Sequence, residues 1–586
     1  MRALAPNRKT QERSPPSLSV STAAQVATRA ITFALNLATA RRLSVAAYGV
    51  ASVQFHLVNT TILLLAREGL RRGCLTAGQQ QQQQEEEAGR GRRSPASLPT
   101  RQVLATAALA LPAGMAVAAA VLGVAGRWGG GVAGGTAAAA AAARALRLQA
   151  FAALLELASE PLYVLASLRL RFGVRVGAEA AATLVRGGLS LWLLGRVGEG
   201  EGKAGDGRGW RRWWPRPGQQ PPPGFLVSLT PGLALSWGQV AYGGVILAVH
   251  LAAFAPGAAA AVAGWRRKRK QARKGRPPPA PSASSRLLLD PTTLALCRGF
   301  SLQAAEKLVL AEGSRAVLAA SAPADAQGAY GLAANVGSLA VRTLFAPVEE
   351  AAFLAFARPG PAAAAGRLLA VLARVTALVG GLGAAFGPPY AWLAVRTVYG
   401  PRWACGTAAP AALGAYAAYT ALLALNGVLE AFAHARGGPA ELAAGNAALL
   451  ALAVAGAGAG VVGAAAAGAV GLVAADALTM AARIAWALGV VRRVLGGRAA
   501  PRFVPGGLLP ARASLAALAA AGVLCCASDT LLLGGRCALS SSFWPRAAAH
   551  AGVGVVALAG VVAVLARHEG SVVREVRALR AGKRFE

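Results

Sequence analysis

The sequence contains few acidic residues, few histidines and few cysteines for its length. Of 586 residues, 24 are Asp or Glu against 60 Lys or Arg, five are His and six are Cys. The histidines are scattered and no cysteine pair has the spacing typical of a zinc site, so we predict no metal centre. Because the cysteines mostly lie in or beside apolar segments, we expect them to be small buried residues: Cys74, Cys297, Cys405, Cys525, Cys526 and Cys537.

Motifs for nucleotide binding and catalysis are also missing. The sequence has no P-loop, so we exclude transport driven by ATP bound to this chain. The stretch GAGAGVVG at residues 456–463 has the spacing of a dinucleotide-binding turn, but it lies inside an apolar run with no strand before it and no acidic partner. No residues form the pattern of a catalytic site, and we therefore expect neither an enzyme nor a bound cofactor.

Long apolar runs dominate what the sequence does contain. Hydrophobic residues make up 55% of the chain and its mean hydropathy is +0.47. They occur in runs of roughly 18–25 residues, the length that crosses a bilayer. We predict an all-α polytopic membrane protein with about 14 transmembrane helices. The predicted spans are 20–40, 47–66, 102–125, 134–166, 175–196, 228–255, 292–318, 327–356, 366–387, 409–432, 440–463, 465–491, 511–533 and 547–567.

A short motif recurs at the same distance from an acidic residue in both halves of the chain. The sequence Ala-Tyr-Gly at 47–49 precedes Glu68 by nineteen residues, counted from the glycine. The same sequence at 329–331 precedes Glu350 by the same interval. Each copy lies near the start of one half, so we interpret the match as an internal duplication. Such duplication is common in transporters and predicts two lobes in pseudo-repeat.

Segments of low complexity or dense charge separate the predicted spans. A Gln, Glu and Arg stretch at 79–93 and a Trp, Arg and Pro stretch at 198–224 are predicted to be disordered inserts. The predicted organisation is a disordered cytoplasmic tail at 1–19, an N-terminal six-helix lobe at 20–256, a basic cytoplasmic linker at 257–291, a C-terminal six-helix lobe at 292–491, two additional helices at 511–567 and a basic cytoplasmic tail at 568–586.

The net charge of +36 would indicate nucleic-acid binding in a soluble protein, but here the basic residues lie mainly between apolar spans. Positively charged loops that face the cytoplasm explain this pattern, so we expect no nucleic-acid partner. With a cytoplasmic N-terminus, the cytoplasmic connections and both tails hold most of the Lys and Arg. We therefore expect both termini in the cytoplasm. The N-terminal segment has no apolar signal-peptide core, so the first span is expected to direct insertion.

Ionisable and amide side chains within the spans are the candidate functional residues. Ions cost several kcal/mol in hydrocarbon unless they are paired or hydrated, so these side chains should face the bundle interior. Two interpretations stay open for each charge: it lines a hydrated central cavity, or it pairs with another charge and holds helices together. The set as a whole, spread over both halves, favours the cavity. Its members are Arg29, Arg67, Glu68, Glu156, Glu160, Glu179, Arg186, Glu306, Lys307, Glu312, Arg315, Arg342, Glu349, Glu350, Asn426 and Glu430.

Six stretches match a known family in the order in which the family has them: RAITFALN, LLLAREGLRRGCL, LLELASEPLYVLA, LVLAEGSRAV, YGLAANVGSLAVRTLFAPVEEAAF and ALNGVLEAFA. On these residues, which cover most of the length, the chain resembles the Rft family of endoplasmic-reticulum membrane proteins, the eukaryotic lipid-linked oligosaccharide translocation proteins. The resemblance implies a fold similar to the multidrug/oligosaccharidyl-lipid/polysaccharide exporters, with two six-helix lobes around a central cavity. It also implies a role in protein N-glycosylation.

The cargo implied by the resemblance is a dolichyl-diphosphate heptasaccharide, with five mannose and two N-acetylglucosamine units, that moves from the cytosolic to the lumenal leaflet. The implied partners are this lipid, membrane lipid and membrane proteins of the glycosylation pathway. Arginines would bind the diphosphate, and acids would contact sugar hydroxyls or form gating pairs. By match to the family's motifs, and with Glu160 and Asn426 added from their helical spacing, the predicted cavity residues are Arg29, Arg67, Arg71, Glu160, Glu312, Arg342, Glu349, Glu350, Asn426 and Glu430.

Two other functions share these sequence features. One is a non-transporting helper, a scaffold that sequesters lipid-linked oligosaccharide or hands it to glycosyltransferases. The other is a small-molecule exporter of the same fold. Such an exporter would couple to protons or sodium, and no acidic residue in the sequence marks a coupling site clearly.

Overall fold

The computed structural model describes residues 31–87, 101–128, 136–169, 171–197, 229–272, 289–496, 505–534, 537, 543–570, 572 and 574–575. These residues form helices and contain no strand, which confirms the predicted all-α class. Helical residues 31–42 open the described N-terminal lobe. The elements that follow in this lobe are α2 (Val45–Gly49), η1 (Val50–Phe55), α3 (His56–Leu63), η2 (Leu64–Glu68), α4 (Gly69–Glu87), α5 (Arg101–Ala108), α6 (Ala110–Trp128), α7 (Thr136–Ala158), α8 (Glu160–Leu168), α9 (Phe172–Val197) and α10 (Pro231–Ala272).

The C-terminal lobe begins at Pro291 and is followed by two more helices. Asp290 caps its first helix by accepting a hydrogen bond from the backbone N–H of Thr293, and hydrogen bonds from Thr292 and Thr293 lower the pKa of Asp290. The elements are α11 (Pro291–Ser321), α12 (Ala324–Ala340), η6 (Val341–Phe345), α13 (Ala346–Ala357), α14 (Ala362–Val398), α15 (Pro401–Ala404), α16 (Ala409–Arg436), α17 (Pro439–Leu495), η7 (Pro505–Leu508), α18 (Arg512–Leu533) and α19 (Phe543–His568).

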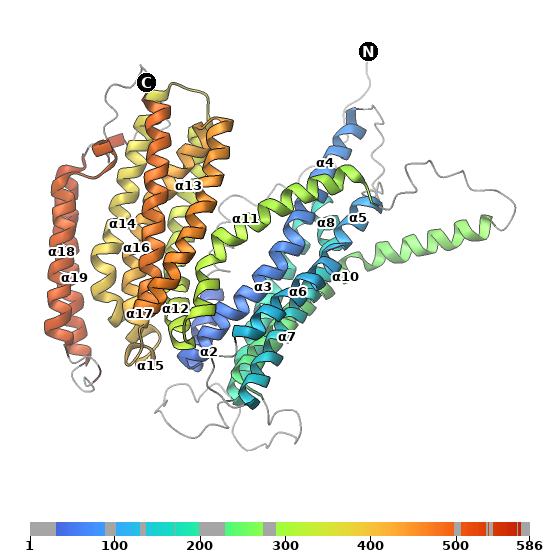
Figure 1. Cartoon of the computed structure of the whole chain (residues 1–586), viewed down its shortest axis with the longest axis horizontal. Coiled ribbons are helices and arrows are strands. Elements are labelled where there is room, and N and C mark those ends of the chain that lie inside the picture. Colours follow the sequence, from blue (N-terminus) through green and yellow to red (C-terminus); the bar gives the residue numbers. More distant parts are fainter. Residues whose placement is uncertain are drawn as a thin grey trace, which may run out of the picture.

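The two lobes form a V in which the helices meet at one end and diverge toward the other (Figure 1). The lobes meet where α2 packs against α12, at the lower end of the view. Helix α11 runs obliquely between the lobes and packs against α4 on one side and α17 on the other. The hairpin of α18 and α19 lies at the outer edge of the C-terminal lobe, against α14.

The duplicated Ala-Tyr-Gly motif lies at the meeting point of the lobes. A Cβ atom on Gly49 would lie 2.1 Å from the carbonyl oxygen of Ala324, and one on Gly328 would lie 2.1 Å from the carbonyl oxygen of Val45. The contacts are reciprocal, because each lobe places a glycine against the backbone of the other. Small residues at such crossings allow helix backbones to approach closely. Gly328 directly precedes the second copy, whose own glycine, Gly331, packs against Ser52 and Tyr48, so the two copies of the repeat lie against each other.

The predicted spans 440–463 and 465–491 form the single element α17, which bends sharply at Ala467 and Gly468. Gly468 adopts φ +55°, a conformation that glycine tolerates and that reverses the chain here. The two arms then run back along each other, since a Cβ atom on Gly463 would meet Gly471 and one on Gly456 would meet Thr479. The glycines at 456–463 thus allow the two arms of α17 to pack closely.

Nine helices in the described ranges are long and apolar enough to cross a membrane. The helices α9, α11 and α12 are not among them. All three contribute polar or charged side chains to the cavity described below, which lowers their hydropathy. The predicted count of fourteen spans stays a prediction.

Helices extend into two segments that were predicted to lie outside the membrane spans. Helix α4 continues through the glutamine run to Glu87, although residues 79–93 were expected to be disordered. Gln and Glu are good helix formers, and a helix that already exists can extend through them. Helix α10 likewise continues to Ala272, past the predicted lobe boundary at 256, through a run of alanines. Residues 88–100, 198–228 and 273–288 lie outside the described residues, as do 1–30.

The cysteines are not all isolated buried residues, as the sequence suggested. Cys405 and Cys537 form a disulfide with their Cα atoms 5.8 Å apart. Cys405 follows α15, and Cys537 lies between α18 and α19. The bond therefore ties the C-terminal hairpin to the connection between α14 and α16. The prediction was wrong for this pair because 132 residues separate the two cysteines, a distance at which spacing carries no signal.

The C-terminal hairpin also docks through buried polar contacts. His550 stacks on Tyr390 of α14 with ring centroids 4.2 Å apart, and its ring nitrogen lies 2.9 Å from the hydroxyl oxygen of Ser528. At the other end of the hairpin, the carboxylate of Glu569 accepts hydrogen bonds from the backbone N–H of Ala511, at 2.7 Å, and from Ser514, at 2.9 Å. A carboxylate at this position caps the N-terminus of α18 and complements its dipole.

Candidate functional site

A cavity of about 580 Å³ lies between the two lobes. Its walls come from residues 32–63, α7, α9 and α10 of the N-terminal lobe and from α11, α12 and η6 of the C-terminal lobe. Much of the lining is polar or charged, which is unusual inside an apolar helical bundle and marks a path for a polar ligand. The polar residues of this central cavity include Asn36, His56, Asn59, Gln149, Arg186, Gln239, Asn335 and Arg342.

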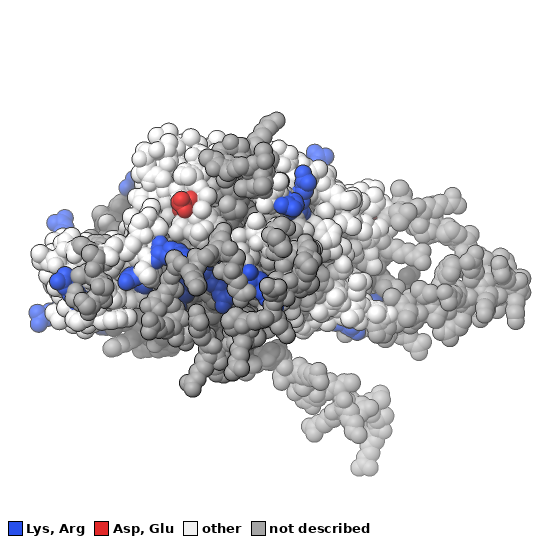
Figure 2. Space-filling view, turned by 90° about the horizontal axis from the view of Figure 1, so that it is seen from below, with Lys and Arg blue, Asp and Glu red and all other residues white. Residues whose placement is uncertain are grey.

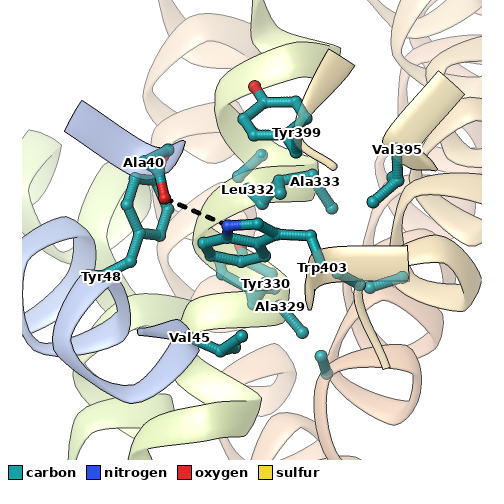
Figure 3. Packing of buried hydrophobic residues seen from close by; sticks show 14 of the residues in the cluster. Ala40, Val45, Tyr48, Ala329, Tyr330, Leu332, Ala333, Val395, Tyr399 and Trp403 are labelled. Atoms are coloured by element: carbon teal, nitrogen blue, oxygen red, sulfur yellow. Dashed lines mark hydrogen bonds between the residues drawn. The ribbon is translucent and has the colours of Figure 1, made fainter. Parts of the chain in front are cut away.

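Aromatic residues from both lobes pack together next to the cavity, and Tyr48 among them also lines it (Figure 3). We infer that they close its lower end. The indole N–H of Trp403 donates a hydrogen bond to the carbonyl oxygen of Ala40, at 3.1 Å. The ring of Tyr48 meets that of Trp403 edge to face, with centroids 5.2 Å apart, and the Tyr48 hydroxyl accepts a hydrogen bond from Asn335. The side chains of Ala40, Tyr48 and Trp403 are all buried. We call Ala40, Tyr48 and Trp403 the closing cluster.

Arginines at the same end bind the C-terminal ends of helices. Arg41 donates to the carbonyl oxygens of Val398, at 2.6 Å, and Thr397, at 3.2 Å, while Arg42 donates to that of Leu191, at 3.0 Å. Seen from below, this face shows more basic than acidic side chains among its described residues (Figure 2). Guanidinium groups at helix C-termini satisfy free carbonyls and complement the helix dipole. Arg41 also joins the lobes, because Val398 belongs to α14.

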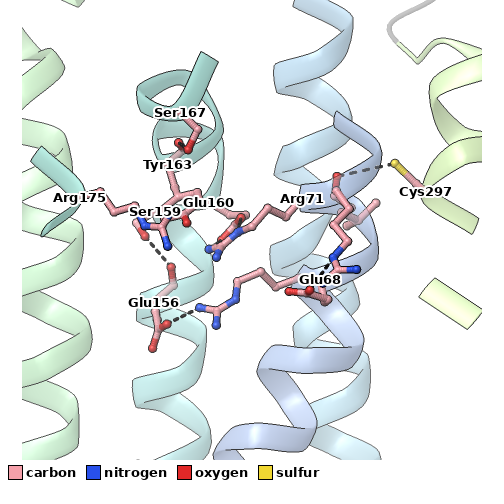
Figure 4. Close-up of polar contacts among 12 residues, drawn as sticks. Glu68, Arg71, Glu156, Ser159, Glu160, Tyr163, Ser167, Arg175 and Cys297 are labelled. Atoms are coloured by element: carbon pink, nitrogen blue, oxygen red, sulfur yellow. Dashed lines mark hydrogen bonds and ion pairs between the residues drawn. The ribbon is translucent and has the colours of Figure 1, made fainter. Parts of the chain in front are cut away.

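The predicted residues of the N-terminal lobe form two neighbouring ion pairs between α7–α8 and the long helix that ends in α4 (Figure 4). Arg67 binds Glu156, and Arg71 binds both carboxylate oxygens of Glu160, with Nη2 2.7 Å from Oε2. Glu160 is 1% exposed, and the Arg71 guanidinium stacks on the ring of Tyr163 at 3.5 Å. Glu156 faces the central cavity, whereas Arg71 and Glu160 lie outside its lining.

On α11, Glu312 joins the two lobes. Its carboxylate lies 2.7 Å from a guanidinium nitrogen of Arg315 and 3.2 Å from the ring nitrogen of His56, which belongs to α3. The same Arg315 nitrogen lies 3.2 Å from His56. Arg315 and His56 line the cavity, and Glu312 is buried behind them. Glu312 thus contacts the site through its partners.

In the C-terminal lobe, Glu430 binds Arg483, which is not among the predicted residues. Both of its carboxylate oxygens accept hydrogen bonds from Arg483 of α17, at 2.7 and 3.0 Å, and Asn426 donates to Glu430 at 2.7 Å. Arg483 lines a smaller pocket of about 210 Å³ next to the central cavity. Asn426 and Glu430 lie behind Arg483 and are outside the lining of either cavity.

The remaining predicted residues are Arg342, Glu349, Glu350 and Arg29, and the structure places them in different surroundings. Arg342 lines the central cavity and donates to the Ser338 hydroxyl at 2.6 Å. Glu349 is half-buried and packs against Gly427, while Glu350 is exposed, and neither lines the cavity. Arg29 lies outside the described residues. Of the ten residues predicted to line the cavity, Arg342 is the only described one that does so, and the others reach the cavity through a partner or lie away from it. Glu156, Arg186 and Arg315, which belong only to the wider set of candidate residues, also line it.

Asp476, Arg483 and His56 contribute to these cavities but are absent from the predicted site. Asp476 and Arg483 are seven residues apart on one arm of α17, so they share a helix face in an otherwise apolar span. Two charged residues at this spacing in an apolar span predict a polar helix face that points into the bundle. His56 was set aside because histidines are few, yet its place in the middle of a span carries the same signal. Arg186, noted only as an ionisable residue, lines the cavity and donates to Gln239 at 3.3 Å.

A model of the Rft protein family matches residues 13–578 of this chain. The chain belongs to the Rft protein family. Curated members share modest identity with it. A Yarrowia lipolytica protein named Man(5)GlcNAc(2)-PP-dolichol translocation protein is 30% identical over 51% of this chain and 44% of that protein. Proteins of the same name are 28% identical in Xenopus tropicalis and 27% identical in Mus musculus, each over 70% of this chain and 69% of the relative.

The fold of this Rft family member also resembles a solved structure. Lipid II flippase MurJ in an inward closed conformation superposes with a TM-score of 0.53, covering 92% of this chain and 99% of that one at 10% sequence identity. At this identity the likeness concerns the fold. It agrees with two helical lobes around a central cavity, as the resemblance noted from the sequence implied.

Proposed function

We propose that this protein moves a dolichyl-diphosphate heptasaccharide from the cytosolic to the lumenal leaflet of the endoplasmic-reticulum membrane, for use in protein N-glycosylation. The observation that carries the proposal is the polar central cavity, closed at one end by the closing cluster, in a chain whose family members are named for translocating this lipid. A diphosphate and a glycan cannot cross hydrocarbon without such a cavity, because each unsatisfied polar group costs several kcal/mol there.

The arginines of the central cavity are suited to the diphosphate. Arg186 has a neutral hydrogen-bond partner, Gln239, and its guanidinium lies 5.5 Å from the Tyr242 ring. Arg342 lies across the cavity on the other lobe, in a π-helical turn. Guanidinium groups bind phosphate oxygens bidentately and strongly. With one arginine from each lobe, a bound diphosphate would draw the lobes together, and the dolichyl tail would remain in the lipid during alternating access.

Reconstitution into liposomes that contain the dolichyl-diphosphate heptasaccharide tests this function through the rate at which the lipid changes leaflet. We expect the protein to accelerate crossing and Arg342→Ala to slow it at least tenfold, because a lost hydrogen bond to a charged group costs about 1.5–3 kcal/mol. Arg358→Ala changes an exposed arginine outside the cavity and is the matched control. In this variant the lipid should cross at the wild-type rate. Binding without acceleration would instead assign the non-transporting helper function.

We further propose that the lower end of the molecule faces the lumen, with both termini in the cytoplasm. Disulfides persist in oxidising compartments, and the Cys405–Cys537 bond lies at the end that carries the closing cluster. In a Cys537→Ser variant, Cys405 should react with a membrane-impermeant maleimide only after sealed microsomes are permeabilised, as measured by mass spectrometry. The buried thiol of Cys297 provides a control that stays unlabelled in both cases. Labelling of Cys405 in sealed microsomes would contradict this orientation.

A further inference from the structure

Asp476 differs from other acidic residues of the C-terminal lobe in its partners. It lies on α17 and accepts hydrogen bonds from the hydroxyls of Ser314, at 2.5 Å, and Tyr330, at 3.2 Å. Glu312 and Glu430 instead pair with arginines. Within the described ranges, no basic side chain lies within ion-pair distance of Asp476. A carboxylate has about four acceptor positions, so two hydroxyl donors leave others open for a ligand.

The surroundings of Asp476 form a pocket of about 210 Å³. Tyr330, Tyr416 and Tyr419 line it, with the last two rings edge to face at 5.5 Å, and Thr479 adds a hydroxyl. Aromatic walls with a few fixed polar groups are typical of small-ligand sites. Tyrosine supplies both an apolar ring face and a hydroxyl, so these walls can contact either part of an amphipathic ligand.

This pocket adjoins the central cavity. Arg315, Ala334 and Ser338 line both, so the two volumes share a wall along α11 and α12. Only these shared side chains stand between a ligand in the central cavity and Asp476, so we infer that such a ligand extends past them. The arrangement suits an elongated polar ligand whose two ends differ chemically.

The charges divide the two volumes between different ligand groups. The arginines of the smaller pocket, Arg315 and Arg483, are neutralised by Glu312 and Glu430 at 2.7 Å. Asp476 adds a carboxylate with no described arginine at ion-pair distance, and this carboxylate disfavours phosphate in the smaller pocket. In the central cavity, Arg186 has only the neutral Gln239 as its hydrogen-bond partner among the described residues. Phosphate is thus favoured in the central cavity over the smaller pocket.

We propose that the pocket around Asp476 is a saccharide subsite, which holds a sugar unit of the cargo while the diphosphate occupies the central cavity. The pocket presents a carboxylate and tyrosine rings. A pyranose ring matches both, because its hydroxyls donate hydrogen bonds to a carboxylate and its C–H faces pack on aromatic rings. The inference rests on the proposed function and adds to it a way to select the glycosylated lipid as cargo. The protein distinguishes a glycosylated lipid from the bare dolichyl diphosphate at Asp476.

Equilibrium binding to the purified full-length protein in nanodiscs tests the subsite with two probes: dolichyl-diphosphate heptasaccharide and dolichyl diphosphate without sugar. We expect Asp476→Asn to weaken binding of the glycosylated lipid about tenfold, the loss of one charge-assisted hydrogen bond, and to leave binding of the bare lipid within twofold. Tyr419→Phe keeps the ring but removes the hydroxyl, so it should also weaken binding of the glycosylated lipid relative to binding of the bare lipid. Asp325→Asn, an exposed carboxylate at the start of α12, is the matched control and should change neither.

Three results would overturn the subsite. The first is an equal loss of affinity for both lipids in Asp476→Asn, and the second is no loss for either. The third is binding of sodium ions, in the absence of lipid, that Asp476→Asn abolishes, since this would make the pocket a cation site. Failure of the wild-type protein to bind either lipid would contradict the proposed function itself, which separates that failure from failure of the subsite.

Discussion

Arg71→Ala is expected to be the most destabilising removal of a single charge in the described chain. The substitution leaves the carboxylate of Glu160, which is 1% exposed, without its bidentate partner. An uncompensated buried charge of this kind costs about 3–5 kcal/mol. The stacking of Arg71 on Tyr163 is lost as well. Thermal unfolding of the purified protein, followed by intrinsic fluorescence, should show a midpoint well below that of the wild type.

Arg72→Ala is the control for this prediction, since Arg72 pairs with Glu68 at 2.7 Å on the more exposed side of the same helix. Exposed pairs contribute about 0–1 kcal/mol, so this variant should unfold close to the wild type. The double variant Arg71→Leu with Glu160→Leu should recover most of the lost stability, because apolar residues often replace a buried ion pair without cost. Equal midpoints for Arg71→Ala and Arg72→Ala would show that the Arg71 pair does not stabilise the fold.

Gly49→Val is expected to abolish translocation by separating the lobes at their closed end. Its Cβ would lie 2.1 Å from the carbonyl oxygen of Ala324 and 2.6 Å from the backbone nitrogen of Gly328. These are backbone atoms that cannot rotate away, so α2 and α12 must move apart. Overpacking typically costs about 1–3 kcal/mol, which lowers the population of the closed arrangement by roughly 5–150-fold.

Spin labels at Trp192 and Asp325, both exposed and on different lobes, measure this separation by pulsed electron resonance. The distance between them should lengthen in Gly49→Val, together with the loss of lipid crossing in liposomes. Gly177→Val makes the same change where a Cβ meets nothing within 4 Å, so it should alter neither the distance nor the rate. An unchanged distance in Gly49→Val would falsify the assignment of this contact as the closure between lobes.

The sequence was sufficient for the helical class and for the repeat that organises the lobes. Apolar length identified the nine helices of the described ranges that can cross a membrane, whereas the spans predicted in α9, α11 and α12 stay predictions. The recurring Ala-Tyr-Gly motif pointed to duplication before the structure placed Gly49 against the other lobe. Helix spacing also showed that Glu156 and Glu160, or Asn426 and Glu430, share a face. Which residues share a helix face is a local property that follows directly from the helical period of 3.6 residues.

The sequence could not reveal the partner that each inward-facing charge selects. Arg67 and Glu156 are 89 residues apart, and Glu430 and Arg483 are 53 apart, so their pairing depends on how helices pack. Both interpretations of the charges therefore apply to parts of the set. Arg71 and Glu160 hold helices together, while Arg342 faces the cavity. The disulfide between Cys405 and Cys537 was missed for the same reason, because only tertiary structure brings these residues together.

That disulfide also sets an order of events during biosynthesis. Cys537 leaves the ribosome 132 residues after Cys405, so the connection that carries Trp403 waits with an unpaired thiol until the last hairpin has entered the membrane. In the proposed orientation this thiol is exposed to the oxidoreductases of the lumen. A chain truncated before α18 keeps the Cys405 thiol free, because its partner Cys537 follows that helix. The bond can therefore close only after the hairpin of α18 and α19 has been synthesised and docked.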